Sequence, residues 1–317
     1  MVPARREVPG TGAENGSPGA GAAGQGGRMD SPVPTGLAPD GTIAREGSLD
    51  RVPSAFLPVV EAARALITGA FGPDRLHSAY LYGSLPRGTA VAGVSDLDLL
   101  LALRHEPGEA DRDAARRIEA ELDARFPQVD GAGVLLHSTR ELLSERERHD
   151  MGFFVACLCT PLLGPDLGER LPRYRPTSLL ARELNGDLGS LIPGWRARLA
   201  SGADRRLLAR NVGRRLVRTA FTLVMPRWGG WTSDLDRSAE VFGAHYPGRA
   251  GQMRRAVAAG RSAETGRRVL EELVGDLAPW LAAEYEAVHG RKAPRGGTGA
   301  PAPPGGSVVP EERLDEA

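Results

Sequence analysis

Residues 79–103 place a tight glycine turn between two apolar runs, and this order constrains the fold more than any other part of the chain. The first run is Ala-Tyr-Leu-Tyr at residues 79–82, and Gly83 and Ser84 follow it directly. The second begins as Ser-Asp-Leu-Asp at residues 95–98 and continues as Leu-Leu-Leu-Ala-Leu. Short apolar runs bounded by turn residues are typical of buried strands. The stretch therefore predicts a strand, a turn, a connector and a second strand.

The second predicted strand carries two carboxylates, Asp96 and Asp98, at its start. Residues two apart on a strand point to the same side, so both side chains are expected on one face. Ionised groups beside an apolar run are unfavourable unless a cation or hydrogen bonds compensate them. A Gly-Ser turn can offer backbone N–H groups to a phosphate. Together these features predict a site for Mg²⁺ and a nucleotide.

The pattern Gly-Ser-x-x-Arg-Gly, a gap of six residues and Ser-Asp-x-Asp resembles the signature of the nucleotidyltransferase superfamily typified by DNA polymerase beta. The superfamily includes the aminoglycoside nucleotidyltransferases. The resemblance implies an α/β (α+β) catalytic domain with a mixed sheet, followed by an all-α helical-bundle domain. It also implies an enzyme that moves a nucleoside monophosphate from an NTP to an acceptor hydroxyl and releases pyrophosphate. We expect the NTP to be ATP and the transferred group to be AMP.

The resemblance assigns roles to individual residues. Asp96 and Asp98 would hold two Mg²⁺ ions, and Asp130 is the best-placed candidate for the third carboxylate of the metal site. Asp130 would also help to deprotonate the acceptor hydroxyl. Gly83 and Ser84 would bind the outer phosphates of the nucleotide.

Two assignments leave an alternative open. Arg87 of the motif either pairs with a phosphate oxygen or forms a structural salt bridge. Asp130 precedes the glycine-rich residues 131–133, so it stands either on a weak third strand or at the start of a turn. A second Ser-Asp-Leu-Asp sequence at residues 233–236 lacks the Gly-Ser turn and the apolar run, which predicts a loop or a helix cap there.

Composition divides the chain into four segments. Residues 1–50 are rich in Gly and Pro and poor in large apolar side chains, which predicts a disordered N-terminus. We expect the catalytic domain at residues 51–170, the helical domain at 171–290 and a disordered tail at 291–317. The expected elements outside the motif are helices at 55–70, 109–126 and 144–160, a third strand at 128–137, and helices at 178–191, 205–224, 235–242, 251–259 and 263–289.

The charge balance argues against a nucleic-acid partner. The chain has 40 Lys and Arg residues against 40 Asp and Glu residues, so no net field attracts a polyanion. Lys292 is the only lysine, and the pairs Arg205-Arg206 and Arg214-Arg215 are interpreted as solvated helix faces. We therefore expect the partners to be a nucleotide and a small-molecule acceptor.

Apolar runs and cysteines indicate the cellular compartment of the protein. The sequence has neither a signal peptide nor an apolar run of about 18 residues, so we expect no membrane association. Cys157 and Cys159 lie in an apolar stretch, which predicts buried, reduced thiols and a cytoplasmic protein.

The acceptor is expected to be a small hydroxylated molecule such as an aminoglycoside, a polycation that acidic side chains would hold. Two alternatives remain open. One is a nucleotidyltransferase that modifies a protein or RNA, and the other is a nucleotide-binding regulator without transfer activity. The sequence does not indicate the oligomeric state.

Overall fold

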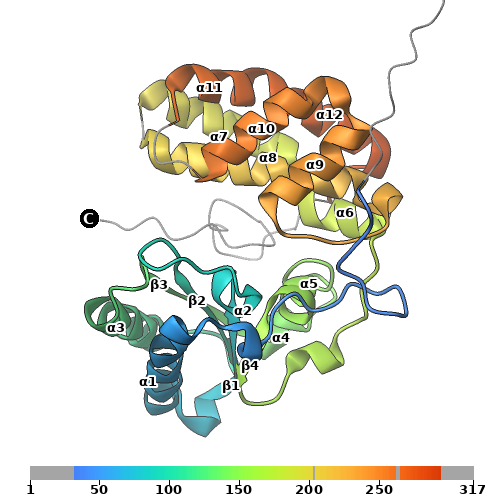
Figure 1. The fold of residues 1–317 in the computed structure, drawn as a ribbon. Coiled ribbons are helices and arrows are strands. Elements are labelled where there is room, and N and C mark those ends of the chain that lie inside the picture. Colours follow the sequence, from blue (N-terminus) through green and yellow to red (C-terminus); the bar gives the residue numbers. More distant parts are fainter. Residues whose placement is uncertain (1–31, 203, 262–264, 294–317) are drawn as a thin grey trace, which may run out of the picture. The chain divides into compact units, whose positions relative to one another are not determined.

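The computed structural model describes residues 32–202, 204–261 and 265–293. The fold is built on a mixed sheet of four strands in the order β3-β2-β1-β4 (Figure 1). β1 runs antiparallel to both β2 and β4, and β2 runs parallel to β3. The strands are β1 (Leu76–Tyr82), β2 (Leu97–Leu103), β3 (Ala132–Ser138) and β4 (Thr160–Leu163). The two apolar runs of the motif therefore form the two central strands.

Helices make up most of the remaining chain. Those near the sheet are α1 (Leu57–Arg75), α2 (Ser84–Arg87), α3 (Glu109–Arg125), α4 (Thr139–Leu142) and α5 (Met151–Phe153), with a π-helical segment at Phe154–Leu158. Those that follow are α6 (Ser178–Asn185), α7 (Leu188–Ser201), α8 (Arg205–Trp228), α9 (Leu235–His245), α10 (Ala250–Arg261), α11 (Arg267–Glu272), a π-helical segment at Leu273–Leu277 and α12 (Ala278–His289). Short 3₁₀ helices lie at Leu49–Arg51, Ser54–Phe56, Leu167–Arg170 and Pro247–Arg249.

Both faces of the sheet are covered, which explains why β2 is apolar at nearly every position. Leu97, Leu99 and Leu101 belong to one hydrophobic cluster with residues of α1 and α3. The alternate residues, Leu100 and Ala102, belong to a second cluster that continues into α6, α8 and α12. The sheet and the later helices therefore share a core, and the division into domains at residue 170 stays a prediction.

The third helical stretch expected from the sequence is the main error among the elements near the sheet. Residues 144–160 contain only the short α5 and a π-helical segment, and the chain then forms the edge strand β4. The apolar residues before Thr160 have no clear period, so a helix and a strand could not be distinguished there. Pro161 lies within β4, and proline is tolerated in a strand only at a sheet edge or a bulge.

The prediction of disorder for residues 1–50 is wrong for residues 32–48, which we call the N-terminal strap. The Ile43 N–H donates to the Tyr174 carbonyl at 2.7 Å, and the Ile43 side chain is only 6% exposed. The strap's fixed path comes from backbone hydrogen bonds to distant segments, which its Gly- and Pro-rich composition does not encode. Residues 1–31 lie outside the described part of the chain.

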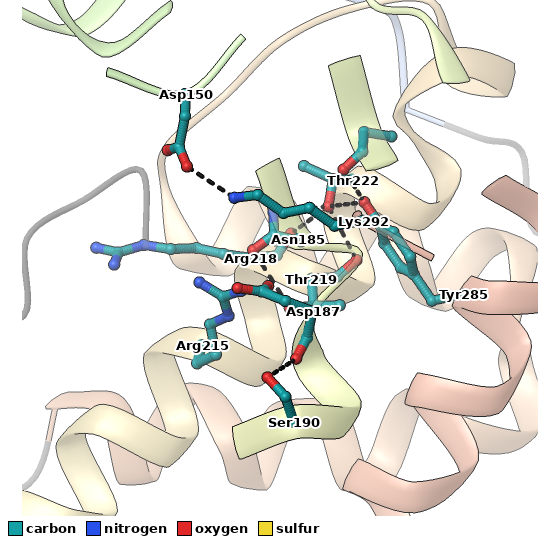
Figure 2. A network of polar contacts seen from close by, with 11 residues as sticks. Asp150, Asn185, Asp187, Ser190, Arg215, Arg218, Thr219, Thr222, Tyr285 and Lys292 are labelled. Atoms are coloured by element: carbon teal, nitrogen blue, oxygen red, sulfur yellow. Dashed lines mark hydrogen bonds and ion pairs between the residues drawn. The ribbon is translucent and has the colours of Figure 1, made fainter. Parts of the chain in front are cut away.

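The predicted C-terminal tail begins too early. Lys292 donates from Nζ to Asp150 Oδ2 at 2.7 Å, and these side chains are only 5% and 4% exposed (Figure 2). The Lys292 N–H also donates to the Gly186 carbonyl at 3.2 Å. Residues 291–293 therefore belong to the folded part, while residues 294–317 lie outside the described residues.

The two cysteines are buried, as predicted, and they are not joined by a disulfide. Burial raises the pKa of the Cys157 thiol to about 12, so this thiol remains protonated near neutral pH.

One described helical stretch, Ser54–Arg75, is long and apolar enough to cross a membrane by length and composition alone. This is weak evidence, since a core helix passes the same test, and Val59, Ala63 and Ile67 are fully or almost fully buried in the sheet's first cluster. The expected absence of membrane association stays a prediction.

Replacement of Lys292 by methionine is predicted to destabilise the fold strongly. The change leaves the Asp150 carboxylate buried without its cation, a loss that typically costs about 3–5 kcal/mol. Urea denaturation of the full chain measures the free energy of unfolding.

The neighbouring Arg291 supplies a control, because its ion pair with Glu286 is exposed on both sides. Arg291→Met should change the stability little. The double variant Asp150→Asn/Lys292→Met should regain much of the lost stability. A Lys292→Met protein as stable as Arg291→Met would show that the buried pair does not hold the C-terminal residues in place.

Candidate active site

Asp96 directly precedes β2 and Asp98 is its second residue, and both lie on the side of the sheet opposite α1 and α3. Asp98 pairs directly with Tyr82 of β1, and it alternates with Leu97 and Leu99, whose side chains face α1 and α3. Asp96 lies two residues earlier, so both half-buried carboxylates lie on the face of the second cluster. Leu97–Leu103 are buried apart from the partly exposed Asp98. This places the two carboxylates as the sequence predicts.

Gly83 allows the Asp98 carboxylate to approach the backbone. The Gly83 φ angle is 80°, which side-chain-bearing residues rarely adopt, and a Cβ at this position would overlap Asp98 Oδ2. Ser84 is the first residue of α2, and its carbonyl accepts a hydrogen bond from the Thr89 N–H at 3.0 Å. The turn and the start of β2 are therefore closely packed against each other.

Asp130, the predicted third carboxylate, lies beside the residue that precedes the pair. It lies before β3 and is exposed, and its N–H donates to the Ser95 carbonyl at 3.0 Å. In the parallel register, Gly133 lies beside Asp98, and Val129, directly before Asp130, is buried in the cluster with α1 and α3. Among the described residues no group of three His, Cys, Asp or Glu side chains could hold a metal, and the role of Asp130 as the third carboxylate stays a prediction.

Arg87 makes hydrogen bonds in place of the salt bridge to a strand carboxylate that was the structural alternative, and its phosphate contact stays a prediction. Its Nε donates to the Gly83 carbonyl at 2.9 Å, and its Nη1 donates to Ser233 Oγ. Ser233 donates in turn from its N–H and Oγ to the Glu46 carboxylate, at 2.8 and 2.6 Å. Arg87 thus ties the glycine turn to the loop before α9 and to the N-terminal strap.

Arg210 is the functional candidate that sequence analysis missed. This residue of α8 places Nη2 3.6 Å from Asp96 Oδ2, with both side chains half-buried. The available signal was the recurrence of arginine every four residues at 206, 210, 214 and 218, which puts these side chains along one helix face.

The other predictions for arginine pairs are mixed. Arg205 and Arg206 are exposed, as expected. Arg215 is instead buried and pairs with Asp187, as Figure 2 shows. Arg214 donates from Nε to the Gly260 carbonyl at 3.1 Å.

The second Ser-Asp-Leu-Asp sequence is a helix cap. Asp234 is the N-cap of α9, and its carboxylate accepts a hydrogen bond from the Arg237 N–H at 2.8 Å. This confirms that the four-residue pattern alone does not define the site.

The donor set fits a magnesium ion that arrives with phosphates, but not a fully protein-bound ion. Within the described residues, no group of three or more His, Cys, Asp or Glu side chains could hold a metal. Mg²⁺ in nucleotide sites needs only one or two carboxylates, because phosphates and water complete its coordination. Asp96 and Asp98 can supply those two ligands.

A pocket of about 570 Å³ lies elsewhere, near the junction of α6 and α7 and the C-terminal end of α12. Its lining includes Asp187, Ser190, Glu286 and Lys292, and none of the predicted site residues.

No protein-family model matches this chain, and no curated protein matches it. Among solved structures, the chain is similar to spectinomycin adenyltransferase AAD(9) from Enterococcus faecialis, whose structure was determined with ATP and spectinomycin. The similarity covers 72% of this chain and 98% of that one, with 13% identity and a TM-score of 0.47. A likeness this distant carries no argument about the activity of this chain, so the site must be argued from its own residues.

Replacement of Gly83 by alanine is predicted to displace the Asp98 carboxylate and weaken Mg²⁺–nucleotide binding. The new Cβ overlaps Asp98 Oδ2, and the positive φ angle adds about 1–2 kcal/mol of strain. Calorimetric titration with Mg²⁺ and ATP measures the binding.

Gly93→Ala is the matched control, because Gly93 has a similar φ of 71° and nothing within 4 Å of the added Cβ. It should show the strain without the loss of binding. Equal nucleotide affinities in the two variants would contradict the role of Gly83 beside Asp98.

Replacement of Arg87 by methionine is predicted to lower stability rather than nucleotide affinity. Hydrogen bonds from charged groups contribute about 1.5–3 kcal/mol, and Ser233→Ala should remove part of the same interaction. A double-mutant cycle of Arg87→Met and Ser233→Ala, measured by urea denaturation, should show that their effects are not additive. A large loss of ATP affinity in Arg87→Met with no loss in Ser233→Ala would restore the phosphate-binding interpretation.

Proposed function

We propose that this chain is a Mg²⁺-dependent nucleotidyltransferase that moves a nucleoside monophosphate from an NTP to a small-molecule acceptor. ATP is the proposed donor, AMP the transferred group and pyrophosphate the leaving product. The observation that supports the proposal most directly is the Asp96–Asp98 pair, fixed on one sheet face with Asp98 against the Gly83 turn. Two buried, reduced thiols are compatible with the proposed cytoplasmic location.

Different residues would bind the magnesium ion and the phosphates of the nucleotide. Asp96 and Asp98 would hold the magnesium ion, and Gly83 and Ser84 would bind the outer phosphates through backbone N–H groups and a hydroxyl. When bound, the ion neutralises charge on the phosphates and on the departing pyrophosphate. Arg210, beside Asp96, adds a guanidinium that can pair with phosphate oxygens.

We propose one carboxylate-held ion rather than two. A second ion near the acceptor would need another carboxylate, and β3 offers only glycine beside Asp98. Positioning and charge neutralisation, which dominate nucleotidyl transfer, remain possible with a single ion.

A nucleotide-binding regulator without transfer activity is the second candidate. It is favoured because no group of three His, Cys, Asp or Glu side chains that could hold a metal is found in the part of the chain that the structure describes, and a site with only two carboxylates can retain nucleotide binding and lose turnover. Nothing observed in the described residues favours modification of a protein or an RNA.

Replacement of Asp98 by asparagine is predicted to reduce pyrophosphate release by about 100-fold or more, since the charge that holds the ion is lost. The measurement uses the full chain, Mg²⁺, each of the four NTPs and a mixed acceptor panel. Asp96→Asn should behave in the same way.

Asp236→Asn is the control, because Asp236 occupies the equivalent position of the second Ser-Asp-Leu-Asp sequence and pairs with Arg261 at 2.5 Å. Its release rate should equal that of the parent protein. Undiminished release by Asp98→Asn would overturn the proposed site. Mg²⁺–ATP binding without release from any acceptor would favour the regulator.

A further inference from the structure

Ser178 and His289 form a hydrogen-bonded pair that shares no residue with the candidate nucleotide site. Ser178 is the first residue of α6, and His289 is the last residue of α12. Ser178 Oγ lies 2.7 Å from His289 Nδ1. The serine is exposed, whereas the histidine is only 8% exposed. A serine at the surface is therefore bonded to a buried imidazole.

The second ring nitrogen of His289 fixes the direction of this hydrogen bond. Nε2 lies 2.9 Å from the Leu223 carbonyl oxygen, which can only accept, so Nε2 carries the proton and donates. Burial lowers the pKa of His289, which keeps the ring neutral near neutral pH. Nδ1 of the neutral ring keeps its lone pair, so Ser178 Oγ donates to Nδ1. A nucleophile bonded to a base that a third group orients is the arrangement that activates a serine.

The first turn of α6 adds donors beside the serine. Thr177, the N-cap, accepts hydrogen bonds from the Leu180 N–H at its side chain and from the Ala181 N–H at its carbonyl. The N–H groups of Ser178 and Leu179 come earlier in the same turn, where the helix offers them no carbonyl. When a serine attacks a carbonyl carbon, negative charge develops on the carbonyl oxygen, and N–H donors stabilise it. These two groups can serve that purpose, while the site itself rests on the serine–histidine pair.

Exposed apolar side chains adjoin both members of the pair in the sequence. Leu179 directly follows Ser178 and is 44% exposed. Val288 directly precedes His289 and is 43% exposed. Exposed apolar surface next to reactive polar groups favours a ligand with an apolar part. A substrate with an apolar chain therefore fits this surface better than a charged one.

We propose that Ser178 and His289 form a second catalytic site, which hydrolyses carboxylic esters with an apolar acyl chain. Ser178 Oγ forms a bond to the ester carbonyl carbon while its proton moves to His289 Nδ1. The bond from that carbon to the alcohol oxygen breaks, and the alcohol leaves with the electron pair and the proton from Nδ1. Water then attacks the acyl carbon and gives its proton to Nδ1, and the serine oxygen leaves and regains that proton. This activity does not depend on the proposed nucleotidyltransferase function.

The first test measures how fast a fluorophosphonate labels Ser178 in the full chain, with the modified residues identified by mass spectrometry. The serine oxygen bonds to phosphorus, and fluoride leaves with the electron pair. Ser190 is the matched comparison, because it is an exposed serine in the first turn of α7 whose Oγ donates to the Asp187 carbonyl at the same 2.7 Å. A positioned base should make labelling of Ser178 about 100-fold faster than that of Ser190, and a ratio below about tenfold would overturn the proposal.

The second test asks whether His289 acts as the base. His289→Gln keeps a hydrogen-bond donor and acceptor but cannot take the proton, so the folded variant should label Ser178 no faster than Ser190. Unchanged labelling in that variant would overturn the proposal.

The pH profile of the parent protein gives a measurement that does not need this variant to fold. Ser178 and the ring of Tyr285, 5.1 Å away, contact His289, and the charge of Arg227 on α8 also lowers its pKa. The labelling rate should therefore rise with ionisation below the ordinary histidine pKa of about 6.5 and then level off. A rate that keeps rising in proportion to hydroxide concentration would show attack without the histidine and would overturn the proposal.

The third test measures ester hydrolysis with p-nitrophenyl butyrate and with the p-nitrophenyl ester of succinate, whose acyl chain has the same length and a charged end. Acylation of lysine adds little background, because the chain's only lysine is buried. Release of p-nitrophenol from the butyrate should fall about tenfold or more in Ser178→Ala and stay at the parent rate in Ser190→Ala. A smaller fall in Ser178→Ala would overturn the ester activity, even if the fluorophosphonate labels Ser178. Succinate ester consumed as fast as the butyrate would overturn the preference for an apolar acyl chain.

Discussion

The packing of β2 between two strands and two hydrophobic clusters is the constraint on which the site depends. Leu97, Leu99 and Leu101 belong to the cluster with α1 and α3, and Leu100 and Ala102 belong to the other. Because a slip of one residue would turn every side chain to the wrong face, this burial fixes the register of β2. The same register sets Asp98 opposite Tyr82 and so brings its carboxylate against the turn at Gly83. The hydrophobic core thus decides where the charged site lies.

A chain of polar contacts extends this order beyond the sheet. It runs from the Glu46 carboxylate in the N-terminal strap to Ser233 before α9. From Ser233 it continues to Arg87 and then to the Gly83 carbonyl. These residues come from three distant parts of the chain. The turn is therefore held both by its own backbone and by segments that fold around it, which gives a candidate binding site the rigid support that precise geometry requires.

The sequence predicts local features of this protein well because they have local causes. The spacing of apolar residues and the glycines next to each segment predict β1, β2 and α3. The two-residue spacing of Asp96 and Asp98 predicts that they share a face. The role of Asp130 stays a prediction, because the direction of a side chain depends on register between strands, which a single glycine-rich segment does not reveal.

The remaining misses involve partners far apart in the sequence. The contacts of Arg210 with Asp96 and of Lys292 with Asp150 each join segments separated by more than a hundred residues. Composition could not distinguish these side chains from the many solvated arginines or from a charged tail. The strand β4 was missed for a related reason, since an edge strand acquires its form from the strand it pairs with.

The burial of the chain's only lysine also has a chemical consequence. An amine-directed reagent finds a single lysine side chain in this protein, and the folded structure covers it. Because the amine reacts only when an opening exposes it, its rate of modification reports how often the C-terminal end of the helical region opens. Lys292 is thus an intrinsic chemical probe of opening at the point where residues 291–293 pack against the core.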